Sequence, residues 1–430
     1  MAPRTSSWLS LNNLPSTDRN IKRVDGWINA RRKEDGAEGL WRVHDGLYDL
    51  QEWIPKHPGG SQWLEITKGV DVTELFETHH LKGDVATQKL RTFYVRNAST
   101  PRTSPFTFKP DGFYKVLKSR VSKKLSSINH SNVLLKSKLV VDTFILLALL
   151  LCVESARRNS YYIALLTGVS LAFGLVANHN FTHLKDNWRM YYIHLGLFSV
   201  REWKISHTVS HHCYANTVLD LEMALPYPFI HWYPTKDKPW NVLWFSKLTP
   251  LFYPCSTIYL IIGRTITLNN EKADCLAFII PIVLMSAGGL SLGSVLTIWL
   301  LVIMTMSSVF VFLGFNGAHH HPDNFHDGDE ISQQDIDFGL HQINSCSERQ
   351  IIGNSVVISM ITFGDHSLHH LFPGLDHSLL PHIQEVFEET CKEFGLELKI
   401  RTYGEYVRGQ FQQLVRTNPR KAKTSKISIQ

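Results

Sequence analysis

Hydrophobic positions are concentrated in the middle of the chain, in stretches flanked by polar segments. Residues 143–153 are uncharged and rich in leucine, and residues 159–178 again carry no charged side chain. Residues 275–318 contain no Asp, Glu, Lys, Arg or His. Since one bilayer crossing takes about 20 residues, this longest stretch predicts two helices joined by a turn at residues 288–293. The pattern therefore predicts an all-α membrane part with four transmembrane helices in two hairpins.

The charged residues around these stretches predict how the helices face the membrane. Residues 101–138 hold nine Lys or Arg and one acid, Asp111. Because basic segments stay on the cytosolic side, we expect the first hairpin to start there. Two hairpins then leave both termini and the segments 179–274 and 319–430 on the cytosolic face. A weaker apolar stretch at residues 249–263 contains two prolines and is interpreted as an interfacial or re-entrant segment.

The first 100 residues are polar and aromatic, and they predict a small α+β unit with turns at residues 45–46 and 58–60. His57 precedes the second turn, in the string His-Pro-Gly-Gly, where its side chain can point into a cleft. His79 and His80 end a stretch with helical character. Two histidines from separate elements, with apolar residues between them, suit the two axial positions of a haem iron.

Composition narrows the function classes. The chain has 22 histidines, 44% apolar residues and only 19% charged residues, which is too apolar for a disordered or nucleic-acid-tail protein. The net charge of +6 is a mild excess, and we expect no nucleic-acid partner. Six scattered cysteines without a CxxC spacing predict reduced thiols in a cytosol-facing protein.

Four histidine boxes lie at the ends of the predicted membrane stretches or in the polar segments after them. Positions i, i+3 and i+4 share one face of a helix, so each box is expected to present its imidazoles in one direction. By the predicted topology, all four boxes lie on the cytosolic face of the membrane. The boxes are His179 and His183; His207, His211 and His212; His319, His320 and His321; and His366, His369 and His370.

The number and spacing of these histidines indicate iron rather than zinc. A zinc site of the HExxH kind has a glutamate after its first histidine, whereas Asn180 follows His179. A structural zinc site needs only four ligands, fewer than the boxes offer. Imidazole also suits iron, and two non-haem iron ions account for the number of histidines. A haem domain in the same chain would supply the electrons that such a centre needs.

The N-terminal string LWRVHDGLYDLQEWIPKHPGG closely resembles the cytochrome b5 domain. The family's Gly-x-Asp-x-Thr-x-x-Phe pattern follows it as Gly69, Asp71, Thr73 and Phe76. The resemblance covers roughly residues 20–97 and implies a one-electron carrier that binds haem b. It implies His57 and His80 as the axial ligands, with His79 as the alternative to His80.

The histidine boxes resemble those of membrane fatty acid desaturases of the front-end type, which carry a fused N-terminal cytochrome b5 domain. The third box and the helix after it, HSLHHLFPGLDHSLLPHIQEVFEETCKEFGLELK, resemble that family's QxxHHLFP block. The likeness spans most of residues 40–400. It implies a di-iron centre, with Asn316 nearby to hold a water and His319 as the alternative to His320. The implied ligands are His179, His183, His207, His211, His212, His320, His366, His369 and His370.

The chain departs from the front-end pattern at two points. His366 stands where front-end enzymes carry Gln, and residues 376–377 are Asp-His where the family has Pro-Arg. Other desaturases have a histidine at the first point, so ligation is still expected, but the acyl substrate and the position of attack do not carry over. Five further histidines are interpreted as structural or surface residues: His194, His231, His341, His377 and His382. Three residues around the second box could orient imidazoles or be ordinary interface residues: Trp203, Lys204 and Asn216.

The resemblance implies a multi-domain protein with a cytochrome b5-like haem domain (20–97), a basic linker (98–138), a membrane desaturase domain with a cytosolic helical cap (139–410) and a flexible basic tail (411–430). It implies an O2-dependent desaturase of a fatty acyl chain, linked to CoA or to a lipid. Cytochrome b5 reductase, using NADH, would be the electron donor, and the endoplasmic reticulum membrane the location. The same features would fit a lipid hydroxylase, or a non-catalytic electron carrier or desaturase-like protein.

Overall fold

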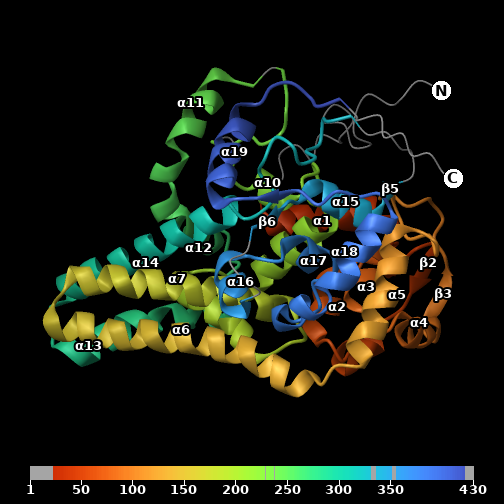
Figure 1. Ribbon diagram of the computed structural model, residues 1–430. Helices are drawn as coiled ribbons and strands as arrows, with labels where there is room; N and C mark the ends of the chain where they lie inside the picture. The colour runs from red at the N-terminus through yellow and green to blue at the C-terminus, as the bar shows by residue number, and fades with distance from the viewer. Residues whose placement is uncertain (1–22, 228, 237, 331–335, 351–354, 422–430) are drawn as a thin grey trace.

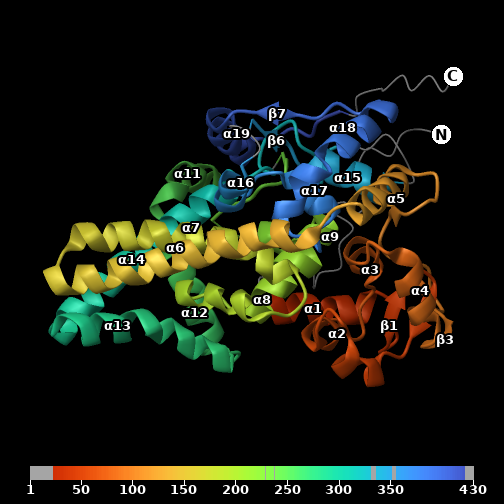
Figure 2. The ribbon, with the colours of Figure 1, turned by 60° about the horizontal axis from the view of Figure 1, so that its bottom comes forward.

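An N-terminal domain packs at one end of an elongated layer of long helices, and a cap of short helices covers the same end (Figures 1 and 2). The computed structural model describes residues 23–227, 229–236, 238–330, 336–350 and 355–421. The predicted order, a domain with strands and helices followed by a helical domain, is confirmed.

The N-terminal domain contains a three-stranded antiparallel sheet in the order β1-β2-β3. Trp41 is fully buried in its core, and the indole Nε1 donates to the Leu64 carbonyl at 3.1 Å. The elements are α1 (Val24–Glu34), β1 (Trp41–Val43), β2 (Gly46–Tyr48), the 3-10 helix Gln51–Lys56, α2 (Ser61–Thr67), α3 (Thr73–His79), α4 (Gly83–Arg91) and β3 (Tyr94–Asn97).

The predicted basic linker is part of the packed structure. It contains β4 (Phe106–Thr107) and α5 (Phe113–Ser126). The hydroxyl of Tyr114, a fully buried residue of α5, lies 3.2 Å from the backbone carbonyls of both Glu77 and Leu371. Since Glu77 belongs to the N-terminal domain and Leu371 to the cap, α5 holds these two parts together.

Three helices are long and apolar enough to cross a membrane: α6 (His130–Arg158), α7 (Tyr161–His183) and α14 (Leu292–Phe315). α6 and α7 form the first predicted hairpin, with Asn159 at the turn in a left-handed conformation. Leu146 and other apolar side chains on the outer faces of these helices are exposed, and such a large exposed apolar surface is typical of contact with lipid.

The first helix of the second predicted hairpin is shorter than expected. α13 (Ile279–Gly288) has 10 residues and follows the 3-10 helix Lys272–Phe278. Asp274 lies in this 3-10 helix and forms an ion pair with Arg264 at 3.0 Å, which holds the charged start of the segment in place. A 3-10 helix is wound more tightly than an α-helix. The turn predicted between the two helices of this hairpin is present, with Gly289 at a φ of 58°.

The segment that was expected to be interfacial consists of short helices. They are α11 (Trp240–Leu248), the 3-10 helices Thr249–Leu251 and Tyr253–Cys255, and α12 (Ser256–Ile266). α12 has 11 residues, too few for a crossing. Trp240 and Trp244 are 75% and 61% exposed, and tryptophan is enriched at membrane–water interfaces, which fits the interfacial interpretation.

Short helices before and after the second hairpin build the cap. Two parallel strand pairs join distant segments of the chain: β4 of the linker pairs with β5 (Ile336–Asp337) of the cap, and β6 (Glu348–Arg349) pairs with β7 (Ile400–Arg401) within the cap. The helices are the 3-10 helix Trp188–Gly196, α8 (Val200–Trp203), the π-helix Lys204–His211, α9 (His212–Tyr214), α10 (Leu221–Ala224), α15 (Phe338–Ser345), α16 (Val356–Thr362), α17 (His366–Leu371), the 3-10 helix His377–His382, α18 (Gln384–Glu393) and α19 (Tyr403–Val415).

The C-terminal segment is held against the cap as far as residue 421. The guanidinium of Arg416 donates to both carboxylate oxygens of Asp329 at 2.7 and 2.9 Å, and the backbone N–H of Arg420 donates to Asp329 at 2.7 Å. The predicted flexible tail therefore begins later than residue 411, because a buried carboxylate binds its first part. Residues 422–430 lie outside the described residues.

The N-terminal domain docks on the membrane domain through the loop 57–60. The backbone N–H of Asp186 donates to the Gly59 carbonyl at 2.9 Å. Lys204 is fully buried at this interface, and its ammonium donates to Gln62 at 2.9 Å and to Asp186 at 2.5 Å. The loop that carries the predicted haem ligand is thus fixed next to the second histidine box.

We predict that Gly60→Ala loosens this docking. Gly60 has a φ of 110°, and a Cβ there would collide with the Asp186 carboxylate, so alanine adds backbone strain of about 1–3 kcal/mol and a clash across the interface. Hydrogen–deuterium exchange should show faster exchange of the Asp186 amide.

The matched control for this variant is Gly39→Ala in the same domain. Gly39 has a φ of 82°, and no described atom lies within 4 Å of a Cβ placed there, so this variant adds strain without a clash. Equal exchange of the Asp186 amide in the two variants would contradict the prediction.

Candidate metal centre

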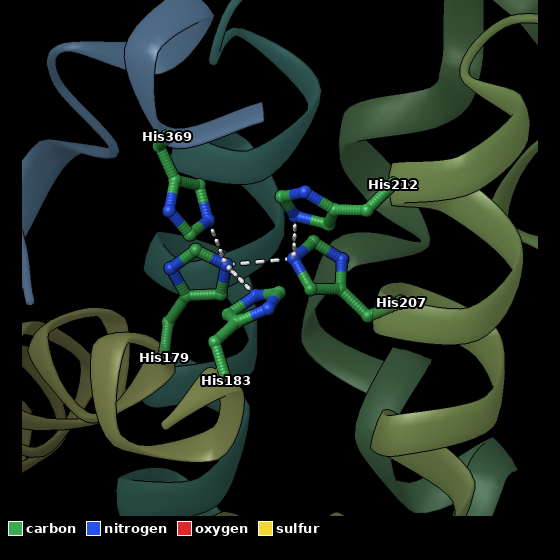
Figure 3. Close-up of side chains that lie close together, drawn as sticks. All are labelled: His179, His183, His207, His212 and His369. Carbon is green, nitrogen blue, oxygen red and sulfur yellow. Dashed lines mark hydrogen bonds between the residues drawn. The ribbon is translucent and has the colours of Figure 1, made fainter. Parts of the chain in front are cut away.

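Five imidazoles from three boxes meet at the cap end of α7 and form the first cluster. Figure 3 shows His179 and His183 from α7, His207 and His212 from the second box and His369 from α17, with their rings gathered around one point. His179 Nε2 lies 2.6, 3.0 and 3.2 Å from the Nε2 atoms of His207, His183 and His369. One ring nitrogen from each of the five lies within 4.8 Å of all the others.

Four more imidazoles form the second cluster, directly beside the first. They are His211, His319, His366 and His370. His319 Nε2 lies 2.7 Å from His366 Nε2, 3.0 Å from His370 Nε2 and 3.1 Å from His211 Nε2. The rings of His212 and His370 stack with centroids 4.0 Å apart, so the two clusters share a wall.

The second box lies on a π-helix, and this winding divides its histidines between the clusters. The backbone N–H of His212 bonds the carbonyl of His207, five residues earlier, so these two side chains lie on one side and reach the first cluster. His211, between them, reaches the second cluster. The box formed by His366, His369 and His370 divides as well. His369 belongs to the first cluster, and His366 and His370 belong to the second. The prediction that each box presents its imidazoles in one direction therefore holds for the first box alone among these three.

The structure brings His319, rather than His320, into the second cluster. His320 is half-buried, and its ring stacks on Trp232 with centroids 3.5 Å apart. His319 is oriented by the carbonyl of Ser345, which lies 3.0 Å from its Nδ1. His319 thus takes the place in which His320 was predicted, because Trp232 holds the His320 ring away from the cluster. His321 packs against α19 and is in neither cluster.

Most imidazoles of the two clusters have a partner behind them that fixes the ring. Metal-binding histidines usually donate the N–H of the ring nitrogen that does not bind the metal. Here that nitrogen is Nδ1, so the lone pair of Nε2 faces the cluster. The Nδ1 partners are Glu222 for His207 (2.6 Å), Asp220 for His211 (2.8 Å), Thr208 for His183 (3.2 Å), Gln342 for His370 (3.0 Å) and His377 for His369 (3.1 Å).

Sequence analysis missed these orienting residues. Asp220 and Glu222 follow the second box closely, so the Asp-Leu-Glu string was a visible signal for carboxylates behind it. Gln342 carried no such signal, because only the packing of α15 against α17 brings it to the site. His377, interpreted as structural or surface, is buried and bonded to a cluster histidine.

Burial sets the charge of the cluster imidazoles that lie outside the membrane helices. It lowers the pKa of His366, His369 and His370 well below the usual range, so these rings are neutral at pH 7 and can offer a lone pair. Burial alone would lower the pKa of His211 too, but the carboxylates of Asp220 and of Glu222 raise it to about 9. A metal ion at the second cluster would therefore displace a proton from this ring.

The donor set fits two iron ions. Neutral imidazoles whose Nε2 atoms approach each other at 2.6–3.2 Å leave lone pairs directed at one point, and a cation there would satisfy them together. The clusters consist of nitrogen ligands only, and imidazole suits iron. One ion can be assigned to each cluster.

A separate histidine pair lies in the N-terminal domain. The ring centroids of His57 and His80 are 6.2 Å apart, which leaves room for one metal atom, since a metal–imidazole bond is about 2 Å long. His57 Nδ1 lies 3.0 Å from the Gly60 carbonyl, and His80 Nδ1 lies 2.9 Å from the Phe76 carbonyl. Both rings therefore keep Nε2 for a ligand, as two axial positions on a haem iron require.

His79 has a different environment from this pair. Its ring lies 5.8 Å from that of Trp63 and contacts Gly374 of the cap, where an added Cβ would be 3.3 Å from the His79 Cα. Of the two alternatives for the second haem ligand, the structure brings His80 next to His57.

The remaining predicted residues have distinct places. Trp203 packs on the His207 ring at 4.8 Å. Lys204 binds Gln62 and Asp186 at the interface between the two domains. The Nδ2 of Asn216 donates to the Ser345 carbonyl at 3.0 Å and so supports the segment behind the second cluster. Asn316 donates to its own helix, and its buried Oδ1 has no hydrogen-bond partner among the described residues.

Comparisons with known proteins identify both parts of the chain. Residues 160–402 match the family model for fatty acid desaturase, and residues 29–99 match that for the cytochrome b5-like haem/steroid binding domain. The chain is 37% identical to the cytochrome b5-related protein of Drosophila melanogaster over 91% of this chain and 92% of that protein. It is 23% identical to the probable Delta(5) fatty acid desaturase C of Dictyostelium discoideum over 89% and 92% of the two chains. No solved structure was found to match the chain.

We predict that His319→Ala lowers the iron content of the purified protein, whereas His320→Ala leaves it unchanged. Removing even a residue that only orients a ligand costs about 10–100-fold in metal affinity, so losing one of the four nitrogens of the second cluster should cost at least as much. Elemental analysis of both variants beside the unchanged protein measures the effect. Iron loss in His320→Ala with full iron in His319→Ala would overturn the assignment.

Proposed function

The chain belongs to the fatty acid desaturase family and carries a fused cytochrome b5 domain, and from this premise we propose that it is a membrane-bound fatty acyl desaturase that uses O2. The observation that carries the proposal is the pair of adjacent, buried imidazole clusters beside a haem-type histidine pair in the same chain. Family membership supports a fatty acyl substrate, carried by CoA or by a lipid.

In this proposal each imidazole cluster holds one iron ion, with His319 in place of His320, and His57 and His80 hold haem b. Bound and reduced, the iron pair supplies O2 activation and the removal of hydrogen from two adjacent methylenes of the acyl chain. Asp220 and Glu222 hold their imidazoles with Nε2 toward the metal. The burial of all the cluster rings keeps bulk water away from the reaction.

Aromatic residues close the first cluster on the membrane side. Trp203 packs on His207, and Phe363 packs on His179 at 5.0 Å. Phe310 of α14 contacts both aromatic residues, at 5.8 and 6.0 Å. In the proposal this apolar wall meets the acyl chain and orients it, because it lies between the membrane helices and the metal ligands.

The N-terminal domain takes electrons from cytochrome b5 reductase, which uses NADH, and delivers them across the docked interface to the clusters. The location is the endoplasmic reticulum membrane, with several crossings and both termini cytosolic. The basic residues of segment 101–138 support this orientation.

The proposal keeps four membrane crossings, and α13 with the 3-10 helix before it forms one of them. Asp274, at the start of the second hairpin, contacts His194 of the cap at 3.0 Å, and the other end leads into His319. Both ends therefore lie at the cap, which supports an even number of crossings. The 3-10 helix Lys272–Phe278 and α13 together span about 29 Å at roughly 2.0 and 1.5 Å per residue, close to the hydrocarbon thickness of about 30 Å.

We predict new double bonds in the fatty acids of a desaturase-deficient host that expresses the protein, measured by mass spectrometry. His369→Ala removes a ligand of the first cluster and should abolish them, while haem content stays unchanged because His369 lies outside the N-terminal domain. Hydroxylated chains in place of double bonds would assign the protein to the lipid hydroxylases. An unchanged profile with iron and haem both loaded would contradict an enzymatic function.

A further inference from the structure

We propose that His79 and His377 connect the haem-binding pocket to the first metal cluster as one route for electrons, and that neither residue is a metal ligand. The inference rests on the proposed function, because it requires both metal centres. It assigns a task to the half-buried His79 and the buried His377, which belong to no ligand set.

His79 lies at the start of this route. It is the chain neighbour of His80, so a single peptide unit joins it to the haem-type pair. Its Nδ1 is held by the Leu75 carbonyl at 3.1 Å, and the ring packs against Trp63 and against the backbone of Gly374. The ring is thus packed between the N-terminal domain and the cap, on the side of the cap that carries the third histidine box.

Gly374 and His377 continue the route inside the cap. A Cβ at Gly374 would lie 3.4 Å from Cδ2 of the His79 ring, so the Gly374 backbone faces this ring across a gap that a single methyl group would fill. The chain then leads from Gly374 to His377, three residues later. His377 Nε2 lies 3.1 Å from His369 Nδ1. His369 Nε2 in turn lies 3.2 Å from His179 Nε2 within the first cluster.

His377 is fixed in position by the first histidine box. Its backbone N–H donates to Asn180 Oδ1 at 3.0 Å, and the side chain of Asn180 donates to Asp376 at 3.0 Å. Ser137 of α6 donates to the same carboxylate at 2.8 Å. The Asp-His pair that departs from the family pattern is therefore built into the wall of the cluster, and the histidine replaces a side chain that would otherwise be cationic.

Electron tunnelling weakens steeply with distance and is favoured by packed and bonded atoms over gaps. This route has one non-bonded step, between His79 and Gly374, and otherwise follows covalent bonds and one hydrogen bond. With both centres loaded, one electron would pass from the haem held by His57 and His80 to the iron held by the first cluster, so that the haem is oxidised by one electron and the iron is reduced by one. No bond of the protein breaks, and both imidazoles keep their protons.

The test measures this single transfer in the full-length protein loaded with haem and ferric iron, without O2 and without acyl substrate. The haem is reduced by a light flash, and its absorbance reports the return to the ferric form. His377→Ala should slow this return at unchanged iron content, because it removes the hydrogen bond by which the route reaches His369. His79→Leu should slow it as well, while the haem spectrum, the haem potential and the exchange of the Asp186 amide stay unchanged.

His382→Ala is the matched control, because His382 belongs to the same 3-10 helix as His377 and is exposed. Rates are compared at equal haem and iron content. Rates in both variants equal to that of the control would overturn the route, and loss of the haem spectrum in His79→Leu would make His79 an axial ligand instead. Absence of any transfer in the unchanged protein would contradict electron delivery by the N-terminal domain, and with it the proposed function.

Discussion

The structure depends on keeping nine imidazoles buried together at one end of a membrane helix layer. Burying a polar atom without a partner costs about 1–3 kcal/mol, so each ring needs a hydrogen-bond partner on one side and a lone-pair acceptor such as a cation on the other. Two carboxylates, a carbonyl, an amide, a hydroxyl and the ring of His377 supply the first requirement for six of the rings. The cap contributes these partners, since Asp220, Glu222, Gln342 and Ser345 all belong to it.

The sequence predicted the first hairpin, the boxes, the turn between α13 and α14 and the haem-type pair, because each follows from a local pattern. It did not predict how the boxes divide between the clusters. A π-helix and an α-helix cannot be told apart from the spacing of His207, His211 and His212, because they differ in whether each backbone hydrogen bond spans five residues or four. The choice between His319 and His320 also needed the structure, since Trp232, which holds His320 away, is far from it in sequence.

Other differences arise from contacts between distant segments. The linker became part of the packed structure because Tyr114 reaches both the N-terminal domain and the cap. The first part of the tail packs against the cap because the buried carboxylate of Asp329 accepts hydrogen bonds from Arg416. Both outcomes come from polar side chains that appear ordinary in the sequence, and only the positions of their partners give them a role.

The uneven division of the boxes has a chemical consequence for the proposed centre. The first cluster has five nitrogens and the second has four, so an ion in the second cluster has more free coordination positions. Catalytic metal sites keep such positions for water or substrate. A glutamine at position 366 would leave the second cluster with three imidazoles. His366 adds a fourth, so the two clusters differ less in their number of nitrogen ligands. The departure at His366 thus adds a ligand to the second cluster and still leaves it one nitrogen short of the first.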